Sequence, residues 1–310
     1  MNKKTVLVTG GCGFIGSHLV AGLVKKGYRV RILDNLLTGK VENLASIDLK
    51  DVEMCVGDVK DFSSVDAIVE GCEYVFHQAA IVSVIKSIED PVGTGKVNYG
   101  GTVNVLEAAR KHNVRRVIFA GSAAVYGDEP TLPKNELMQP MPINPYAVDK
   151  LASEFMGQVY TRLFGIEFVS LRYFNVFGSR QDPLSPYSGV ISIFCHQIRQ
   201  GFTPAIYGDG FQSRDFIHVS DIVGANLTIM ECPTLKTRIF NVGRGSATTL
   251  LDVLNEINYL TGQNLQPIHK DVRLGDVRHS FADNTALKAL GWSPLISIRE
   301  GLTELLNLKS

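Results

Sequence analysis

The chain has 310 residues, of which 45% are hydrophobic and 20% are charged. These proportions are ordinary for a globular protein and exclude an intrinsically disordered class. Thirty-one basic residues balance thirty-one acidic ones, so the charge gives no support to binding of nucleic acid or of an anionic membrane. No uninterrupted apolar stretch reaches the roughly twenty residues that span a bilayer. We therefore expect no nucleic-acid partner and no membrane attachment.

The cysteines indicate a reducing environment. An odd number without any C-x-x-C pair is typical of buried, reduced thiols in a chain of this length. No sufficient apolar region follows Met1–Lys4, which disfavours a signal peptide and leads us to expect a cytoplasmic protein. The cysteines are Cys12, Cys55, Cys72, Cys195 and Cys232.

In chain order, the first half alternates between short β-branched runs and longer helical patterns. Strands that are apolar on both faces and alternate with helices predict a parallel sheet covered on both sides. Because such crossovers are almost always right-handed, the expected fold class is α/β, a Rossmann-like, doubly wound parallel sheet. We expect strands at 5–9, 29–33, 52–56, 74–77, 117–120 and 168–171, and helices at 14–26, 97–111 and 146–164.

The pattern weakens after residue 175. The stretch 178–189 is rich in Gly, Pro and Ser and cannot be a regular element. A strand-like run at 238–242 is expected to return to the sheet, and 250–261 and 284–290 have helical patterns. We predict one domain over residues 1–175 with the returning strand, and a smaller C-terminal lobe over 176–310 that is mainly substrate-binding.

A glycine-rich turn follows the first predicted strand and opens the first predicted helix. Gly10 permits a tight turn, Gly13 lets the backbone approach a pyrophosphate, and Gly16 allows close packing of helix against strand. The helix N-terminus presents free N–H groups and the positive end of a dipole to phosphates. Glycines at this spacing are weak evidence alone, but at the first strand-to-helix turn they predict a dinucleotide site.

Two acidic residues refine this prediction. Asp34 ends the second strand, eighteen residues after Gly16, where a carboxylate accepts hydrogen bonds from an adenosine ribose and repels a 2′-phosphate. That favours NAD over NADP, and the domain over 1–175 is thus expected to bind NAD. Asp58 ends the third strand, near the expected place of an adenine amino group, although a helix N-cap explains it equally well.

Tyr146 and Lys150 lie four residues apart at the start of a predicted helix, just after Pro145, and so share one face. An ammonium group beside a phenol stabilises the phenolate, which suits general-base work on an alcohol. The spacing alone also fits an exposed helix pair. Its position after the fifth strand favours catalysis, because ligands of open α/β sheets bind at the carboxyl edge. Ser122, at the end of that strand, is either a hydroxyl-orienting group or a turn serine.

These residues resemble the extended short-chain dehydrogenase/reductase family, and within it the UDP-sugar 4-epimerases. The resemblance runs nearly from end to end. Its motifs are Thr9–Gly16, Asp34-Asn35, Gly57-Asp58, 77–80, Asn98, 122–127, 144–146 with Lys150, 171–175, 207–210, 214–216 and 273–276.

The resemblance implies a role for each matching position. Tyr146 would be the base, Lys150 its electrostatic partner and ribose anchor, and Ser122 the group that orients the hydroxyl. Contacts to NAD are implied for Gly10, Gly13, Phe14, Ile15, Gly16, Asp34, Asn35, Asp58, Val59, Ala79, Ala80, Asn98, Tyr146, Lys150 and Tyr173. Contacts to a UDP-sugar are implied for Ser83, Ser122, Tyr146, Asn175, Val190, Tyr207, Arg214, Arg273, Asp276 and Ser280, with the two arginines on the diphosphate. No metal is expected.

Two contrasts within the family narrow the function. Related 4,6-dehydratases carry an acidic pair after the Ser/Thr, whereas Ala123 and Ala124 stand here, which disfavours dehydration. The family's epimerases often have Ser or Thr at one of these two positions, so the alanines are a mild departure. Ser280 occupies a position where a bulky tyrosine excludes N-acetyl groups, so the resemblance implies a pocket that admits them. The alternative is that Ser280 only packs.

We therefore expect an NAD-dependent UDP-sugar 4-epimerase. It would interconvert UDP-GlcNAc with UDP-GalNAc, and also UDP-Glc with UDP-Gal, through a transient 4-keto sugar. The alternatives are another sugar-nucleotide oxidoreductase, a dehydratase or a decarboxylase of the same family, or a catalytically silent dinucleotide-binding protein. The family habit implies a homodimer through the helices at 97–111 and 146–164.

Overall fold

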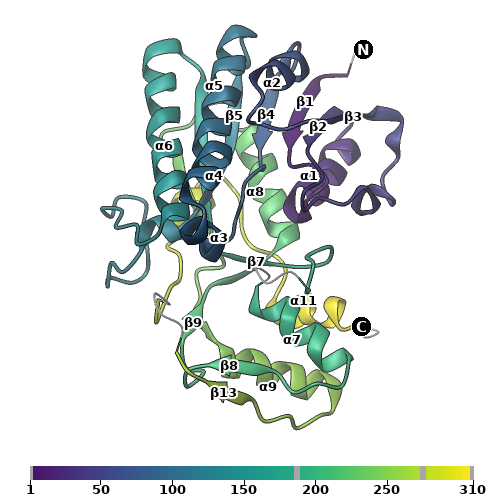
Figure 1. Ribbon diagram of the computed structural model, residues 1–310, viewed down its shortest axis with the longest axis vertical. Coiled ribbons are helices and arrows are strands. Elements are labelled where there is room, and N and C mark those ends of the chain that lie inside the picture. Colours follow the sequence, from purple (N-terminus) through teal and green to yellow (C-terminus); the bar gives the residue numbers. More distant parts are fainter. Residues whose placement is uncertain (1–2, 185–188, 273–276, 308–310) are drawn as a thin grey trace. The chain divides into compact units, whose positions relative to one another are not determined.

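The computed structural model describes residues 3–184, 189–272 and 277–307. Its central feature is a seven-stranded sheet with the strand order β11-β6-β5-β4-β1-β2-β3 (Figure 1). Strands β1 to β5 pair in parallel, each with its spatial neighbour. The expected Rossmann-like, doubly wound α/β fold is confirmed. The strands are β1 (Thr5–Thr9), β2 (Arg29–Asp34), β3 (Val52–Val56), β4 (Tyr74–His77), β5 (Arg116–Ser122), β6 (Glu167–Tyr173) and β11 (Ile239–Val242).

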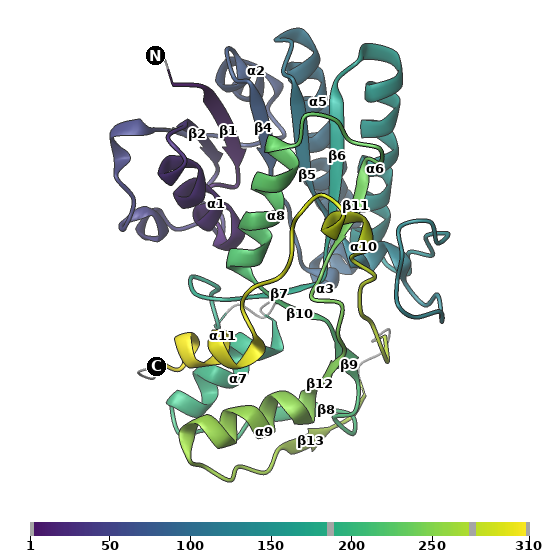
Figure 2. The same ribbon diagram turned by 180° about the vertical axis from the view of Figure 1, so that it is seen from behind.

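Helices cover the sheet on both faces. Figure 2 shows α1 (Phe14–Lys25) and α8 (Val219–Glu231) in front of the sheet, with α5 (Gly101–Lys111) and α6 (Pro145–Phe164) behind it. A Cβ on Gly22 of α1 would meet Val223 of α8 at 2.7 Å, so these two helices pack closely. Parallel neighbouring strands need crossover connections, and these place helices on the faces of the sheet.

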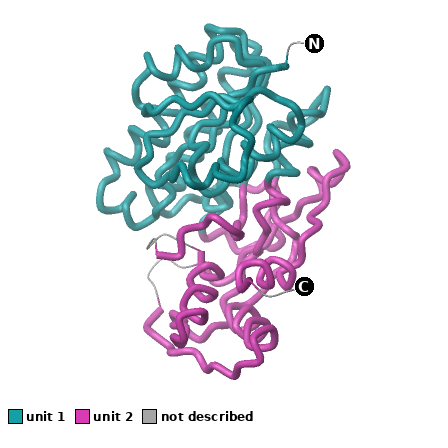
Figure 3. Tube along the Cα trace, turned by 90° about the vertical axis from the view of Figure 1, so that its right-hand side faces the viewer, with its two compact units in different colours: residues 1–127, 139–172, 223–240 teal, residues 128–138, 173–222, 241–310 magenta. Residues whose placement is uncertain are grey.

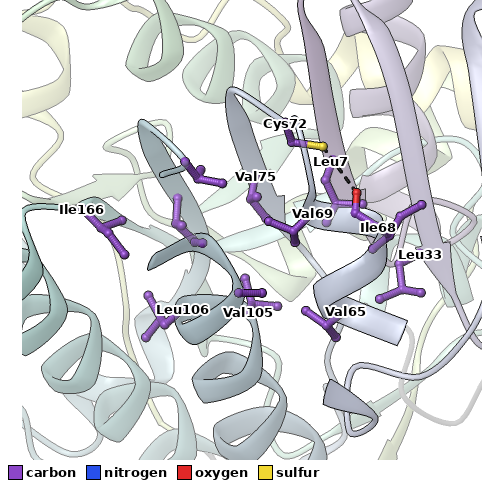
Figure 4. Close-up of a cluster of buried hydrophobic side chains, with 14 of the residues drawn as sticks. Leu7, Leu33, Val65, Ile68, Val69, Cys72, Val75, Val105, Leu106 and Ile166 are labelled. Atoms are coloured by element: carbon purple, nitrogen blue, oxygen red, sulfur yellow. Dashed lines mark hydrogen bonds between the residues drawn. The ribbon is translucent and has the colours of Figure 1, made fainter. Parts of the chain in front are cut away.

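The core behind the sheet is mostly aliphatic. Leu7 and Val75 of the sheet face Val69 of α2 (Phe62–Val69) and Val105 of α5, and all four side chains are fully buried (Figure 4). Burial of a side chain of this size stabilises a fold by about 1.5–3 kcal/mol. This packing fixes the position of each strand along its own axis. It thereby fixes where the polar groups at the carboxyl ends of the strands lie.

The helix expected at 97–111 is interrupted. Helix α4 (Pro91–Gly95) runs into a π-helical turn over Lys96–Gly100, and regular α-helix resumes as α5 at Gly101. A π-turn adds a residue to the helical ladder and is frequent at functional sites. Apolar periodicity alone cannot reveal it, because the inserted residue shifts the pattern by less than one turn.

Sequence reasoning also missed α8, which is apolar along much of its length. The smaller elements around the seven-stranded sheet are α3 (Val84–Glu89) and the 3-10 turns Val41–Leu44, Leu49–Asp51 and Ala123–Tyr126. Among the described residues, no helix has both the length and the apolar character needed to cross a membrane.

The chain forms two compact units that are interleaved along the sequence (Figure 3). Unit 1 comprises 1–127, 139–172 and 223–240, and unit 2 comprises 128–138, 173–222 and 241–310. A boundary at 175 therefore describes the chain only roughly. The segment 128–138 belongs to unit 2, and 223–240 returns to unit 1 with most of α8 and the start of β11.

Unit 2 is built from short elements around its own apolar core, which includes Phe177, Phe194, Ile257 and Leu302. Among the described residues it contains three two-stranded sheets, β7 with β10, β9 with β12, and β8 with β13. The elements are β7 (Asn175–Phe177), α7 (Val190–Arg199), β8 (Ala205–Tyr207), β9 (Ser213–Arg214), β10 (Phe216–His218), β12 (Thr248–Thr249), α9 (Leu250–Thr261), β13 (Ile268–Lys270), α10 (Thr285–Lys288) and α11 (Ile298–Leu305).

Candidate active site

The glycine-rich turn joins β1 to α1 as expected. Gly10 has φ +68°, a left-handed conformation that side chains disfavour, and its N–H donates to the Leu33 carbonyl at 2.8 Å. A Cβ on Gly16 would collide with the Gly10 carbonyl oxygen. Helix α1 begins after Gly13 with no side chain capping its first N–H groups. Free N–H groups at the start of a twelve-residue helix are the donors that a pyrophosphate requires.

Asp34 lies at the carboxyl end of β2, beside this turn. Its carboxylate accepts the N–H of Cys12 and the N–H of Leu36, both at 2.9 Å, and it is 7% exposed. An ionised carboxylate has further acceptor sites, so these two bonds leave capacity for a ribose hydroxyl. The observed contacts give Asp34 a structural role in addition to the predicted one.

Asn35 and Asp58 lie together at the ends of β2 and β3. The Asn35 amide donates to Asp58 at 3.0 Å, and the Lys60 N–H donates to the same carboxylate at 2.9 Å. Burial acts to raise the pKa of Asp58, but these donors and the Lys60 ammonium hold it below its usual value. Asp58 is therefore ionised near neutral pH and able to accept a hydrogen bond from an amino group.

The candidate catalytic residues come from β5 and α6. Asn144 caps α6 by accepting the Ala147 N–H at 2.9 Å, and Pro145 occupies the first turn, which places Tyr146 at the start of the helix. The Ser122 hydroxyl hydrogen-bonds the Tyr146 phenol. The Lys150 ammonium donates to the Ala120 carbonyl at 2.9 Å and lies 5.9 Å from the centre of the Tyr146 ring. Ser122, Tyr146 and Lys150 thus gather at the carboxyl edge of β5.

The electrostatics of this cluster are those of a site that can exchange protons. Burial lowers the pKa of Lys150 to about 8, although the Asp149 and Glu154 carboxylates act to raise it. Burial raises the pKa of Tyr146, and the hydrogen bond from Ser122 opposes that rise. Titratable groups with strongly shifted pKa values at a strand edge are typical of active sites.

Asn98 lies in the π-helical turn and connects three parts of unit 1. Its side-chain oxygen accepts the Ile81 N–H at 2.8 Å and its amide donates to the Ile81 carbonyl at 3.0 Å. The same side chain hydrogen-bonds Asp149 on α6. The expected cofactor-side segment after β4 is therefore tied to the helix that carries Tyr146.

Sequence reasoning missed a buried ion pair behind β5. Glu154 and Arg172 join at 2.7 Å and are 1% and 2% exposed, and Glu154 also accepts the Ser170 hydroxyl at 2.7 Å. A Cβ on Gly121 would collide with that hydroxyl, so only glycine fits between Ala120 and Ser122. The available signal was the spacing of Glu154, four residues after Lys150 on the same helix face.

A second missed feature is a chain of polar side chains beneath the glycine-rich turn. The Thr9 hydroxyl meets His77 at 2.7 Å, and the other ring nitrogen of His77 meets Thr102 at 3.1 Å. Burial and the nearby Lys150 charge lower the pKa of His77 to about 3, so the imidazole is neutral. Thr9 also accepts the Ala79 N–H at 3.2 Å, which fixes the segment after β4 against the turn.

The remaining cofactor-side residues lie mostly in unit 1. Phe14 and Ile15 open α1, Val59 is buried after β3, and Ala79 and Ala80 follow β4. Tyr173 ends β6 and is 7% exposed, and it belongs to unit 2.

The expected substrate-side residues divide between the units. Ser83 caps α3 in unit 1, where its hydroxyl accepts the Lys86 N–H at 2.9 Å. Unit 2 holds Asn175, exposed at the start of β7, and Val190 at the start of α7. Tyr207 lines a shallow cavity of unit 2 with Gln212 and Arg278. Arg214 and Ser280 also belong to unit 2, whereas Arg273 and Asp276 lie outside the described residues.

The described side chains include no group of three or more His, Cys, Asp and Glu that could hold a metal ion. The groups that the described site offers for chemistry are the glycine-rich turn and the side chains of Ser122, Tyr146 and Lys150. A Rossmann-like domain with this turn and this trio defines an NAD-dependent enzyme of the extended short-chain dehydrogenase/reductase type.

Comparison with known proteins gives the family. Residues 6–243 match the NAD dependent epimerase/dehydratase family. A putative UDP-glucose 4-epimerase of Methanocaldococcus jannaschii is 39% identical, with 97% of each chain covered. A UDP-N-acetyl-alpha-D-glucosaminuronate decarboxylase of Bacillus cytotoxicus is 32% identical, with 97% of this chain and 96% of that one covered. The chain belongs to the NAD dependent epimerase/dehydratase family, and its cofactor is NAD.

Solved structures agree with this assignment. The UDP-N-acetylglucosamine 4-epimerase of Methanobrevibacter ruminantium, in complex with UDP-N-acetylmuramic acid, has a TM-score of 0.93 at 36% identity, with 99% of both chains covered. The UDP-glucose 4-epimerase of Thermotoga maritima with UDP-glucose has a TM-score of 0.93 at 37% identity, covering 98% of this chain and 97% of that one. A Thermus thermophilus UDP-glucose 4-epimerase complex with NAD has a TM-score of 0.87 at 36% identity, covering 97% and 98%.

Proposed function

We propose that the protein is a UDP-sugar 4-epimerase that interconverts UDP-GlcNAc with UDP-GalNAc and UDP-Glc with UDP-Gal. The observation that carries the proposal is the meeting of Ser122, Tyr146 and Lys150 at the carboxyl edge of β5. Relatives named as UDP-glucose and UDP-N-acetylglucosamine 4-epimerases support it over nearly the whole chain.

The residues of unit 1 fit an NAD molecule. The uncapped start of α1 would bind the pyrophosphate through backbone N–H groups, and Asp34 would accept an adenosine ribose hydroxyl. Asp58 would accept the adenine amino group, and Lys150 would contact the other ribose. When bound, NAD supplies a hydride acceptor and, after reduction, a hydride donor next to the sugar.

Tyr146 would act as the base. Its phenolate would take the proton of the sugar 4-hydroxyl, which Ser122 would orient through a hydrogen bond. The charged Lys150 and an oxidised nicotinamide both favour the phenolate, which offsets the rise in the pKa of Tyr146 caused by burial. After the 4-keto sugar has rotated in the site to present its opposite face, Tyr146 would return the proton to the new 4-hydroxyl.

Unit 2 would bind the nucleotide and select the sugar. Arg214 is suited to the diphosphate, and the same role is proposed for Arg273, whereas Asp276 would face the nucleotide ribose. Asn175, Tyr207, Val190 and Ser83 would complete the substrate contacts. Ser280 is small and partly exposed, which leaves room for an N-acetyl group.

Two rival reactions are distinguished by their chemistry. A 4,6-dehydratase needs an acid and a base after Ser122, but Ala123 and Ala124 stand in the 3-10 turn that follows it. One relative, at 32% identity, is named as a decarboxylase. A decarboxylase would act on a UDP-uronic acid. The intact trio argues against a catalytically silent binding protein, because binding alone requires no base.

We also propose a homodimer. Helix α6 exposes a row of large apolar side chains, including Phe155, Val159 and Leu163, and neighbouring α3 and α4 expose Ile88 and Val92. Apolar rows of this kind on a soluble fold are typical of interfaces. Among the described residues of α5, which the expected interface also included, no large apolar side chain is exposed. A Phe155→Glu variant that runs as a monomer while the wild type runs as a dimer in light scattering would support this interface.

A cytoplasmic location is proposed from the thiols. All five cysteines, each within the described residues, are unpaired. Burial raises the pKa of Cys12 and of Cys72 to about 11, so both thiols stay protonated and unreactive. Unpaired, inert thiols suit a reducing compartment. Fractionation of the native cells, with recovery of the protein among the cytoplasmic enzymes, tests this location.

The function is tested by following the anomeric proton signals of separate samples with UDP-galactose, UDP-N-acetylgalactosamine and UDP-glucuronic acid. Each sample contains purified protein and added NAD. We expect conversion of the first two into their gluco partners without net formation of NADH. Release of carbon dioxide from UDP-glucuronic acid, or accumulation of NADH, would instead assign one of the rival oxidoreductases.

A further inference from the structure

Three consecutive residues of unit 2, Ser213, Arg214 and Asp215, hold one distant segment of the chain. The Ser213 N–H donates to the Arg278 carbonyl at 3.0 Å, and the Ser280 N–H donates back to the Ser213 carbonyl at 3.2 Å. The Arg214 guanidinium donates to the same Arg278 carbonyl at 3.3 Å. The segment is thus joined to β9 by an isolated β-bridge between Ser213 and His279.

Asp215 completes this arrangement from inside the unit. It is fully buried, and its carboxylate accepts three backbone N–H groups, from Arg244 at 2.7 Å, Gly245 at 2.9 Å and Ala282 at 3.0 Å. Burial raises the pKa of this carboxyl, while the three donors favour the ionised form. A buried carboxylate with three donors holds its partners much more tightly than a neutral side chain would.

The turn at Gly243 is shaped around this carboxylate. A Cβ there would lie 2.6 Å from Asp215 Oδ2 and 2.8 Å from Ala282 Cβ, so only glycine fits. Three separate stretches, at 215, 243–245 and 282, therefore converge on one side chain. Because a shift in any of them would leave a buried charge without a donor, their relative positions are narrowly defined.

We propose that Asp215 is a positioning residue that fixes Ser280 relative to Arg214, and so sets both the affinity for the sugar nucleotide and the choice between N-acetylated and plain hexoses. The inference rests on the proposed function. Ser280 is held at two points. Its own N–H donates to the Ser213 carbonyl, and two residues later the Ala282 N–H donates to the Asp215 carboxylate. Asp215 itself reaches no reacting atom in this proposal and acts only through its neighbours.

The test is Asp215→Asn, which keeps size and removes the charge. Asp215 Oδ2 accepts two N–H groups and Oδ1 accepts one, so an amide in either orientation points its NH₂ at a backbone N–H. We expect KM for UDP-galactose and UDP-N-acetylgalactosamine to rise about tenfold, with their preference ratio altered, because several positioning bonds are lost. The value of kcat should change less than about threefold, since the trio in unit 1 is untouched.

Asp221→Asn is the matched control. Asp221 is also a buried carboxylate of unit 2, 4% exposed, and accepts two backbone N–H groups, from Leu295 at 2.8 Å and Ile296 at 3.3 Å. It anchors the segment before α11 and no substrate-side residue. We expect both Asp215→Asn and Asp221→Asn to lower Tm. Asp221→Asn should leave KM and the preference ratio unchanged.

Hydrogen exchange separates positioning from activity. In Asp215→Asn the amides of Ser280 and Ala282 should exchange faster, and in Asp221→Asn those of Leu295 and Ile296 should. If Asp215→Asn does not fold, Ser213→Ala removes the 2.9 Å bond to His279 and should move KM and the preference ratio in the same direction, by less.

Several outcomes would overturn the inference. One is a folded Asp215→Asn protein whose KM and preference match those of Asp221→Asn, and another is a Ser213→Ala protein with wild-type KM when the first variant is unfolded. A wild-type protein inactive on both sugar nucleotides would instead reject the proposed function. In that case unchanged exchange at Ser280 and Ala282 in the Asp215 variant would separately reject the positioning role.

Discussion

The catalytic edge of unit 1 and the Ser280 segment of unit 2 are held in place by different means. Lys150 and Tyr146 stand on a capped, twenty-residue helix, and Ser122 ends a strand in the middle of a seven-stranded sheet. Ser280 lies on a segment that is bonded to the two-residue strand β9 and is further held by a hydrogen bond from the Ala282 N–H to the Asp215 side chain. Regular helices and strands position the proposed catalytic residues, whereas individual polar contacts position Ser280, the residue proposed to select the substrate.

This difference has a physical reason. Many backbone hydrogen bonds and a packed core together hold each helix and strand in place, so one substitution moves it little. A segment held by a few side chains responds to each of them. We therefore expect substitutions at the edge of β5 to change kcat, and substitutions around the Ser280 segment to change KM and substrate preference.

Tyr146→Phe should have the largest effect, because it removes the proposed base and little else. General-base catalysis contributes about 10²–10⁴-fold, so we expect kcat to fall by about 10³-fold with KM nearly unchanged. Steady-state kinetics with UDP-galactose measures the change, and an unaltered Tm is the control for folding. Near-normal turnover would rule out the proposed chemistry.

Gly16→Ala should come next, because its Cβ would collide with the Gly10 carbonyl oxygen and force the glycine-rich turn open. We expect NAD affinity to fall by about 100-fold, the effect of losing one or two hydrogen bonds to a charged phosphate. Gly100→Ala is the control, since its Cβ would meet nothing closer than 3.8 Å. Titration of both proteins with NAD by calorimetry checks the result, and equal affinities would contradict it.

Ser280→Tyr should separate the two proposed substrates. A bulky ring at this position should exclude an N-acetyl group and leave a plain hexose unaffected, which changes the ratio of kcat/KM values by about 50-fold. The measurement is kcat/KM for UDP-N-acetylgalactosamine and for UDP-galactose. Ser280→Ala should keep the wild-type ratio, and an equal loss on both substrates in the tyrosine variant would sink the gating role.

The pH dependence should show the smallest effect. Burial lowers the pKa of Lys150 from 10.5 to about 8, so the ammonium loses its proton as the pH rises through about 8. Since the charged form supports the phenolate and its share falls from about one half at pH 8 to about one tenth at pH 9, kcat should fall about fivefold over that range. The groups that face Lys150 are Asp149 and Glu154 on its own helix, which raise its pKa, the Tyr146 phenol, and neutral His77 of β4.

Lys150→Arg tests the assignment of that pH limb. A guanidinium stays charged over the whole range, so the decline near pH 8 should disappear even if kcat is lower throughout. A limb that persists in the arginine variant belongs to another group and would contradict this assignment.

Local patterns in the sequence predicted the framework of unit 1. The central strands lie within a few residues of their expected positions, and Gly10, Gly13 and Gly16 form the expected turn. These features depend on the spacing of near neighbours, which the sequence displays directly. The π-turn at Lys96–Gly100 and helix α8 escaped prediction, the first because it disturbs a helical period only slightly.

The sequence by itself determined the sheet, the glycine-rich turn and the common face of Tyr146 and Lys150, because each follows from the spacing of residues that are close in the sequence. Only the tertiary structure decided that Ser122 meets Tyr146, that Glu154 pairs with Arg172, and that Asp215 holds Ala282, sixty-seven residues away. Such contacts depend on the path of the whole chain, and strands of two residues are too short to show a period. Polar groups buried without a local partner had to find distant ones, and the fold supplied them.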